Sequence, residues 1–195
     1  MNDSHFFALL NRMKYINRWA LMKNTSTENL CEHSFEVAVI AHALCIIGNE
    51  RLDRNYDADK AAVIALYHDF SEIITGDMPT PVKYRNETLK SEYKKVEHDA
   101  CITLIEKLPQ DLQSVYGDIM QGGDNAELQK IIKAADKISA LIKCSEELKF
   151  GNTDFSAAKE STEKAIRELN VEEADIFLKE FMPSYSLPLD DLLKG

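Results

Sequence analysis

Glycine and proline are scarce in this chain, with 7 Gly and 5 Pro among 195 residues. Collagen-like, linker-rich and low-complexity architectures depend on these residues and are therefore excluded. No apolar run approaches the roughly 18–20 residues that are needed to cross a bilayer, so we expect no membrane partner. Positive charge is also in deficit, because 23 Lys and Arg face 33 Asp and Glu, a net charge of −10. Such an acidic surface repels a phosphate backbone, which argues against a nucleic-acid partner.

Closely paired cysteines are missing as well. The four cysteines, Cys31, Cys45, Cys101 and Cys144, form no CxxC pair, and three of them lie within apolar helical patterns. We therefore expect buried, reduced thiols rather than a disulfide framework. The first residues show no basic segment followed by a long apolar stretch and a cleavage site, so we expect no secretory signal. These features predict a cytoplasmic protein.

The chain is rich in apolar residues at helical spacing, and no segment alternates convincingly as a strand would. Helices are predicted over residues 4–16, 31–47, 58–74, 87–107, 110–121, 126–149, 154–169 and 171–182. We expect Gly48 to end the second helix and Asp57 to cap the third. Residues 77–81 are expected to be non-helical because they contain two prolines. The length fits one domain, so the sequence predicts an all-α, single-domain helical bundle over residues 1–195.

Some polar groups fall where the pattern predicts burial. Residues 58–74 are apolar on nearly every side, which indicates a buried central helix that places His68, Asp69 and Glu72 within one turn. His33 lies at the start of the apolar stripe of residues 31–47. His42 faces apolar neighbours in the same segment, and we expect it to be a core histidine.

A further carboxylate, Asp136, lies at the edge of the apolar stripe of residues 126–149. An unpartnered buried carboxylate costs several kcal/mol, so it normally pairs, takes up a proton or binds a metal. Together with His33, His68 and Asp69, Asp136 completes a set of two imidazoles and two carboxylates that suits a divalent transition metal. The alternative is a polar cluster neutralised by basic residues elsewhere in the fold, and the spacing alone does not decide between the two.

Basic residues gather near the N-terminus of this acidic chain. Residues 1–26 hold Arg12, Lys14, Arg18 and Lys23 against Asp3 alone. Such a cluster could receive an anion of the size of one phosphate, whereas scatter of charge at a helix end is the simpler interpretation.

The spaced pattern H…HD…D, here His33, His68-Asp69 and Asp136, resembles the signature of the HD-domain metal-dependent phosphohydrolases, an all-helical superfamily. The segments INRWALMKN (16–24), TENLCEHS (27–34) and YHDFSEIITGDMPTPVKY (67–84) resemble its bacterial 5′-deoxynucleotidase branch, the YfbR type. The similarity continues through IIKAADKISALIKCSEEL (131–148) to FMPSYSLPLDDL (181–192), and so it covers essentially the whole chain.

The resemblance implies a role for each matching position. The implied metal ligands are His33, His68, Asp69 and Asp136, of which His33, Asp69 and Asp136 also contact the substrate. Glu72 matches the catalytic carboxylate. Arg18 and Trp19 match the pair that binds the phosphate and the sugar, and Arg18 is also implied in catalysis. The loop that reads the sugar is matched by Asp77, Met78, Pro79 and Thr80.

The resemblance also implies an activity and an assembly. Proteins of this family hydrolyse 2′-deoxyribonucleoside 5′-monophosphates with broad base tolerance, use one divalent metal ion such as Co²⁺ or Mn²⁺, and form homodimers. Two alternatives stay open at this point. One is an HD phosphohydrolase for another nucleotide ester, such as a dNTP, an alarmone or a cyclic nucleotide. The other is a nucleotide-binding HD module without turnover.

Overall fold

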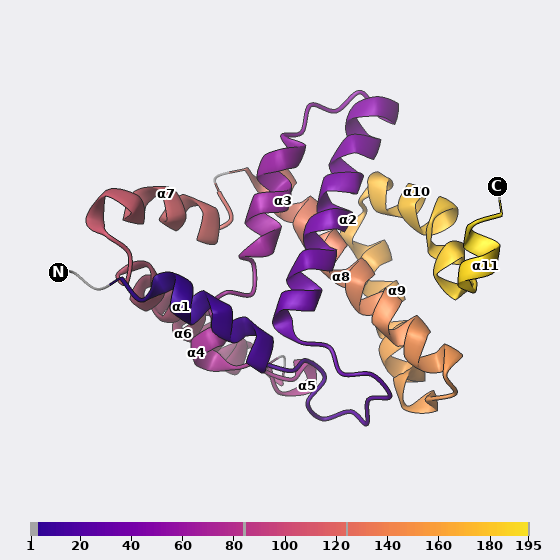
Figure 1. The fold of residues 1–195 in the computed structure, drawn as a ribbon, viewed down its shortest axis with the longest axis horizontal. Coiled ribbons are helices and arrows are strands. Elements are labelled where there is room, and N and C mark those ends of the chain that lie inside the picture. The colour runs from indigo at the N-terminus through magenta and orange to yellow at the C-terminus, as the bar shows by residue number, and fades with distance from the viewer. Residues whose placement is uncertain (1–3, 84, 124, 195) are drawn as a thin grey trace.

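A computed structural model describes residues 4–83, 85–123 and 125–194, and shows a bundle of helices. Within those residues no strand forms, and the one isolated β-bridge joins Asn17 to Asn29. The elements in chain order (Figure 1) are α1 (Phe6–Leu10), η1 (Asn11–Tyr15), α2 (Leu30–Arg51), α3 (Ala58–Leu66), α4 (Glu72–Thr75), α5 (Thr80–Lys83), α6 (Glu87–Ile105), α7 (Gln110–Met120), α8 (Ala126–Lys149), η2 (Thr153–Phe155), α9 (Ser156–Leu169), α10 (Glu172–Glu180), η3 (Met182–Ser186) and α11 (Leu189–Leu192).

Four helices start where a short polar side chain satisfies backbone amides of the first turn. Asn29, Asp57, Asn86 and Asn125 each accept hydrogen bonds from amides in the first turn of α2, α3, α6 and α8. Such caps contribute about 1 kcal/mol each. The cap at Asp57 confirms the predicted start of α3.

The main core forms where α2 and α8 cross, with α3 on one side and α9 and α10 on the other (Figure 1). Fully buried aliphatic side chains, among them Leu44, Leu128 and Ile138, fill this crossing. Each contributes about 1.5–3 kcal/mol through burial. A second cluster, built around Phe6, Phe70 and Leu104, joins the N-terminal helix to α6. The turn that follows α3 therefore lies between two cores.

The prediction of one continuous helix over residues 58–74 is wrong. α3 ends at Leu66, and residues 67–71 form a turn before α4 begins at Glu72. In this turn the His68 ring nitrogen Nδ1 bonds the carbonyl oxygen of Ala65 at 2.7 Å, an oxygen that a continuing α-helix would offer to the amide of Asp69. Val63 is also 40% exposed, so α3 is not buried on every side as the sequence indicated.

Gly48 does not end the second helix. α2 continues to Arg51, and Gly48 is buried inside it. A Cβ atom at this position would lie 2.6 Å from Cε2 of Tyr56, so the glycine allows the Tyr56 ring to pack against the helix. The position demands a small side chain rather than a helix terminus.

Three smaller predictions also need correction. Residues 11–15 form a 3₁₀ turn rather than a continuation of the first α-helix. Thr80 and Pro81 begin the short helix α5, because proline is tolerated in a first helical turn. The side chain of His42 is 44% exposed, with Nε2 3.6 Å from Oδ1 of Asp59, so it is not a core histidine.

All four cysteines are free, as expected, but their burial differs. Cys45 and Cys144 are buried, Cys101 is half-buried and Cys31 is exposed near the start of α2. α2 is also long and apolar enough to span a membrane by length and composition, although 56% of its most apolar window is buried inside the fold. Its apolar character serves the core on one side and leaves a second apolar side exposed.

Candidate active site

Four side chains that are distant in the sequence converge beside the turn after α3. His33 comes from the first turns of α2, His68 and Asp69 from the turn itself, and Asp136 from α8. Nε2 of His33 lies 3.3 Å from Oδ1 of Asp136 and 3.5 Å from Oδ2 of Asp69. Nε2 of His68 lies 3.2 Å from Oδ2 of Asp69. One ligand atom each from His33, His68 and Asp136 falls within 4.8 Å of the others, a spacing suited to one metal ion.

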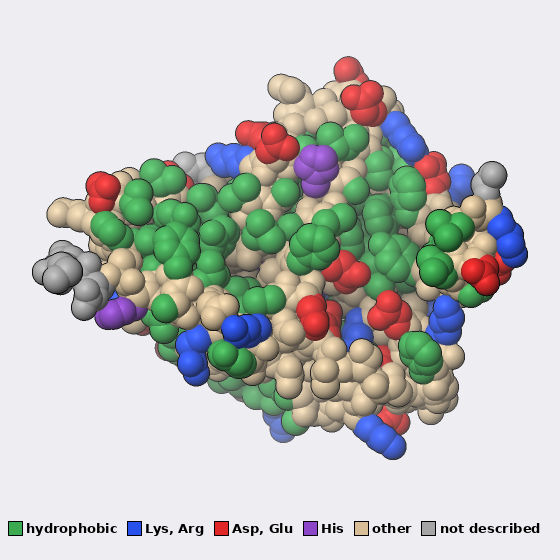
Figure 2. Space-filling view, viewed as in Figure 1, with side chains coloured by type: hydrophobic (Ala, Val, Ile, Leu, Met, Phe, Trp, Pro, Cys, Tyr) green, Lys and Arg blue, Asp and Glu red, His purple; other side chains and the backbone are tan. Residues whose placement is uncertain are grey.

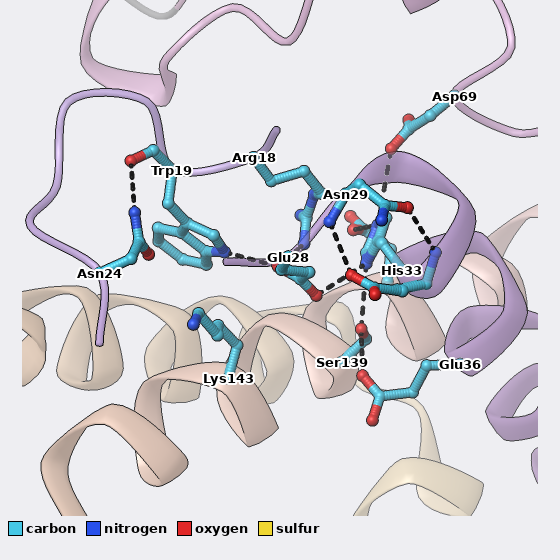
Figure 3. Close-up of polar contacts among 12 residues, drawn as sticks. Arg18, Trp19, Asn24, Glu28, Asn29, His33, Glu36, Asp69, Ser139 and Lys143 are labelled. Atoms are coloured by element: carbon cyan, nitrogen blue, oxygen red, sulfur yellow. Dashed lines mark hydrogen bonds and ion pairs between the residues drawn. The ribbon is translucent and has the colours of Figure 1, made fainter. Parts of the chain in front are cut away.

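Hydrogen bonds at the far side of His33 determine which of its nitrogens faces this cluster. The hydroxyl of Ser139 donates to Oε2 of Glu36 at 2.6 Å, and its oxygen lies 3.0 Å from Nδ1 of His33 (Figure 3). Because the Ser139 proton is already used, Ser139 accepts from Nδ1–H of His33. Nε2 is then the nitrogen that faces the cluster, the arrangement that metal-binding histidines adopt.

His68 is arranged in the same way through a different partner. Its Nδ1 donates to the carbonyl of Ala65, so Nε2 is the nitrogen that faces the cluster. Burial alone would lower the pKa of His68, but Asp69 and Asp136 raise it to about 9, so a bound cation would take the place of the proton on Nε2. The Nε2 atoms of both His33 and His68 are buried and accept no hydrogen bond from any described residue. A buried polar atom without a partner is costly, and two of them aimed beside two carboxylates fit a divalent cation.

The charges in the cluster favour a cation between the carboxylates. Burial would raise the pKa of Asp69, but His68 and His33 hold it well below the usual range. Burial likewise opposes the low pKa of Asp136, which Lys137 and the two imidazoles depress. Both carboxylates therefore stay ionised in a buried setting. This is the donor chemistry that a metal ion of charge +2 requires.

Glu72 begins α4 and lies directly after the ligand turn. Its side chain is buried, and Oε2 has no hydrogen-bond partner among the described residues. Burial, followed by the charges of Asp69 and Asp77, raises the pKa of Glu72 to about 10. The carboxyl group is thus held in its proton-carrying form beside the cluster, a state typical of a general acid.

Arg18 and Trp19 lie in the loop between η1 and α2, and both side chains are directed toward Glu28 (Figure 3). Burial alone would lower the pKa of Arg18, but Glu28, Asp136, Asp69 and Asp77 raise it. The Arg18 guanidinium carbon lies 5.7 Å from the Trp19 ring centre, and this ring packs 5.3 Å from that of Phe155. A permanent cation is therefore largely buried beside a group of acidic side chains.

Residues 77–80 follow α4 and meet the Arg18 loop. Asp77 accepts a hydrogen bond from the backbone amide of Trp19, which opposes the rise in its pKa that burial causes. Met78 and Pro79 are half-buried, whereas Thr80 is exposed at the start of α5. The structure thus brings Asp77 to the site and leaves Thr80 at its surface.

Comparison with known proteins gives this arrangement a family. The profile of the YfbR-like 5′-deoxynucleotidases matches residues 5–185. The chain belongs to this family. A protein of Pectobacterium atrosepticum named 5′-deoxynucleotidase is 47% identical over 193 residues, which cover 98% of this chain and 97% of that one. Another of the same name from Photorhabdus laumondii is 48% identical over 190 residues, covering 97% and 96%.

Solved structures place this family member in the HD-domain phosphohydrolase fold. An HD-domain phosphohydrolase of Listeria innocua superimposes with a TM-score of 0.81 at 25% identity, over 93% of this chain and 88% of that one. An HD phosphohydrolase of cyanophage S-2L, described as bound to dA and one catalytic Zn²⁺ ion, superimposes with a TM-score of 0.66 at 20% identity. That alignment covers 91% and 95% of the two chains.

Several residues around the site were not predicted from the sequence. They are Glu28, Glu36, Lys137, Ser139 and Glu147, which contact the predicted residues or hold their loop. Ser139 carried a signal, because it is a polar residue inside an apolar stripe. The acidic residues carried none, because a glutamate in a polar loop or on a helix surface is usually solvated.

Proposed function

We propose that this enzyme hydrolyses 2′-deoxyribonucleoside 5′-monophosphates to a deoxyribonucleoside and phosphate, with broad base tolerance. The observation that carries the proposal is the pair of buried, unpartnered Nε2 atoms of His33 and His68 beside two ionised carboxylates. Membership in the 5′-deoxynucleotidase family supports the same activity.

His33, His68, Asp69 and Asp136 would hold one divalent ion, of the Mn²⁺ or Co²⁺ type. When bound, such an ion acts as a Lewis acid that offsets negative charge on phosphoryl oxygens and makes water more acidic. A chemically similar ion, Zn²⁺, is described in the cyanophage relative. The mixed nitrogen and oxygen donor set accepts several of these metals.

Glu72 is proposed as the catalytic proton carrier. Burial is the largest cause of its raised pKa and favours the proton-carrying form, and its unpartnered Oε2 lies next to the ligand turn. This proton can pass to the 5′-oxygen that leaves as the ester bond breaks. The oxygen of an attacking water forms the new bond to phosphorus, and the ionised Glu72 carboxylate accepts a proton from that water, which restores the starting state.

Arg18 and Trp19 are proposed to bind the phosphate and the sugar. The Arg18 guanidinium offers planar donors that match phosphoryl oxygens, and its charge stabilises the charge that develops on them during the reaction. Trp19 offers a flat apolar ring beside it. Residues 77–80, with Asp77, Met78, Pro79 and Thr80, would read the sugar, and His33, Asp69 and Asp136 would also contact the substrate.

We further propose a homodimer that assembles through the exposed side of α2. Phe35, Val39 and Ile46 lie on that side and are 66%, 54% and 41% exposed. Apolar side chains gather on this face of the molecule (Figure 2), and a groove beside it is lined by Phe177 and Phe181 of the α10 region, among others. Contiguous apolar surface of this kind is typical of protein interfaces.

The cytoplasm is the proposed compartment, and nucleic acid is not a proposed partner. Burial raises the pKa of Cys45 to about 12 and that of Cys144 to about 11, so both thiols stay protonated and unreactive. Free thiols suit a reducing compartment. The net charge of −10 disfavours binding of an extended nucleic-acid backbone. One buried arginine, Arg18, is suited to binding a single phosphate group.

Phosphate release from a monophosphate panel tests the proposed activity. Protein loaded with Mn²⁺ or Co²⁺, its metal content measured, is incubated with dAMP, dTMP, dGMP, dCMP and AMP. We expect release from all four deoxynucleotides and slower release from AMP. Metal-loaded protein that releases phosphate from no monophosphate would contradict the proposal. Pyrophosphate or triphosphate released from a dNTP instead would indicate a different nucleotide ester.

A further inference from the structure

The Glu28 carboxylate lies behind the two side chains proposed to meet the substrate. Its Oε2 accepts a hydrogen bond from Nη1 of Arg18 and another from Nε1 of Trp19, each at 2.9 Å (Figure 3). Its other oxygen, Oε1, lies 3.9 Å from Nδ1 of His33. The side chain is only 12% exposed. One partly buried oxygen therefore fixes the positions of both a guanidinium and an indole.

The backbone brings Glu28 to this position. The amide of Arg18 donates to the carbonyl of Glu28 at 2.9 Å, and the amide of Leu30 donates to the carbonyl of Ile16 at 3.0 Å. With the bridge between Asn17 and Asn29, these bonds close the base of the loop over residues 17–29. Residues 18 and 28 therefore face each other across that base, whatever the rest of the loop does.

A different carboxylate holds the body of the loop. Glu147 of α8 accepts hydrogen bonds from the amides of Thr25 and Ser26 at 2.9 and 3.3 Å, and from the Thr25 hydroxyl at 2.6 Å. By contrast, the contacts of the Glu28 carboxylate are with the side chains of Arg18, Trp19 and His33. The two carboxylates therefore have different roles. Glu147 holds the backbone of the loop, and Glu28 orients the side chains of Arg18 and Trp19.

The conformation of Trp19 shows why an orienting group is needed. Its backbone φ is 60°, in the left-handed region that a bulky residue rarely adopts. A hydrogen bond to a charged acceptor is stronger than one between neutral groups, and so it can hold the indole in this conformation. The same oxygen uses one N–H of Arg18 and leaves the other guanidinium donors for an anion.

We propose that Glu28 is a positioning residue that holds Arg18 and Trp19 in one fixed relative orientation, so that a nucleoside monophosphate meets phosphate and sugar contacts that are already aligned. The inference rests on the proposed roles of Arg18 and Trp19. Glu28 acts through these two side chains and does not itself touch the substrate.

The test uses the full chain, loaded with Mn²⁺, carrying Glu28→Gln or Glu28→Ala. Glu146→Gln is the matched control, because Glu146 is an exposed carboxylate that lines the same surface hollow as Glu28. Wild type is measured first on dAMP, and this measurement alone tests the proposed activity. The ratio of each variant to wild type then tests Glu28.

We expect Glu28→Ala to raise KM for dAMP about tenfold or more, with a smaller change in kcat, because loss of charge-assisted hydrogen bonds weakens binding by about this factor. Glu28→Gln keeps one carbonyl acceptor and should fall between Glu28→Ala and wild type. Metal content should not change in either variant, and Glu146→Gln should match wild type.

Tryptophan emission gives an independent readout, because Trp19 is the only tryptophan. We expect both Glu28 variants to shift the emission maximum, whereas Glu146→Gln leaves it in place. This readout needs no turnover, so it tests the Glu28–Trp19 contact even if the monophosphate panel fails. Wild-type KM and wild-type emission in Glu28→Gln would overturn the proposal. A loss of kcat with lost metal and unchanged KM would also overturn it, because Glu28 would then act through His33.

Discussion

At the scale of single residues, the site depends on acceptors that turn one nitrogen of each histidine toward the cluster. Ser139 does this for His33, and its own proton goes to Glu36. We predict that Ser139→Ala lowers the affinity for Mn²⁺ about 10–100-fold, because the His33 ring loses the partner that fixes its tautomer and orientation. Ser145→Ala is a matched control, since Ser145 bonds the carbonyl of Leu141 within its own helix α8. Calorimetric titration that gives equal affinities for the two variants would contradict this role of Ser139.

Glu72 makes a second prediction at this scale. Glu72→Gln keeps the shape of the side chain but removes the proton that the carboxyl group can transfer. We expect kcat for dAMP to fall about 10²–10⁴-fold, because this is the usual contribution of a general acid. Metal content should stay at the wild-type level. Phosphate release at saturating substrate, measured beside elemental analysis, checks both expectations, and a kcat within twofold of wild type would remove Glu72 from the reaction.

At the scale of elements, the loop over residues 17–29 depends on a buried carboxylate of α8. Burial alone would raise the pKa of Glu147, but hydrogen bonds from Lys143, Thr25 and Asn152 hold it below its usual range. An unfolded glutamate takes up its proton near pH 4.3, whereas the folded one stays ionised there. The unfolded chain therefore binds more protons as the pH falls. The stabilisation by Glu147 is complete at pH 7 and decreases below about pH 5.

Glu147→Gln tests this dependence. At pH 7 we expect the variant to lose about 3 kcal/mol of unfolding free energy, because Lys143 is left buried without its partner. At pH 4 the difference in unfolding free energy between variant and wild type should be about 0.7 kcal/mol smaller. The reason is that unfolded wild-type chains take up a proton on Glu147 near pH 4.3, whereas folded ones do not. Urea unfolding at both pH values measures it, with Glu146→Gln as the exposed control. A difference that grows as the pH falls would contradict the assigned direction of the Glu147 pKa.

The elements themselves were largely predictable from the sequence, because helical spacing of apolar residues reflects burial on one side of a helix. α8 is an example, since its predicted range of 126–149 and its bounds in the structure agree. The turn at His68 was not predictable, because the apolar pattern continues through it and a single side-chain hydrogen bond ends the helix. The end of α2 was predicted wrongly at Gly48 for a related reason. In the sequence, a glycine that lets an aromatic ring approach a helix cannot be distinguished from a glycine that ends the helix.

The site was predictable to a similar extent. His33, His68, Asp69 and Asp136 were identifiable because they lie in apolar segments, where burial of an ionisable group without a partner is costly. The structure brings them together. Glu28 did not stand out, because its importance comes from which residue lies opposite it across a loop base, and residue type does not encode that pairing.

At the scale of the whole molecule, the exposed side of α2 should hold two copies together. We predict that Val39→Glu converts the proposed dimer to a monomer, because a charge buried in an apolar interface without a partner is strongly unfavourable. Val96→Glu on α6 is the matched control, with a parent side chain of similar exposure, 50% against 54%. Light scattering coupled to size-exclusion chromatography measures the mass of each variant. A Val39→Glu protein with an unchanged dimer mass would place the interface elsewhere.

The central claim is that two helices and one turn bring four ligands around a single ion. Anomalous diffraction at the manganese edge from a crystal grown with Mn²⁺ tests it most directly. The account predicts one strong peak within about 2.0–2.3 Å of Nε2 of His33, Nε2 of His68 and a carboxylate oxygen each of Asp69 and Asp136. A map with no peak among these atoms, from crystals of protein that releases phosphate from dAMP, would contradict it.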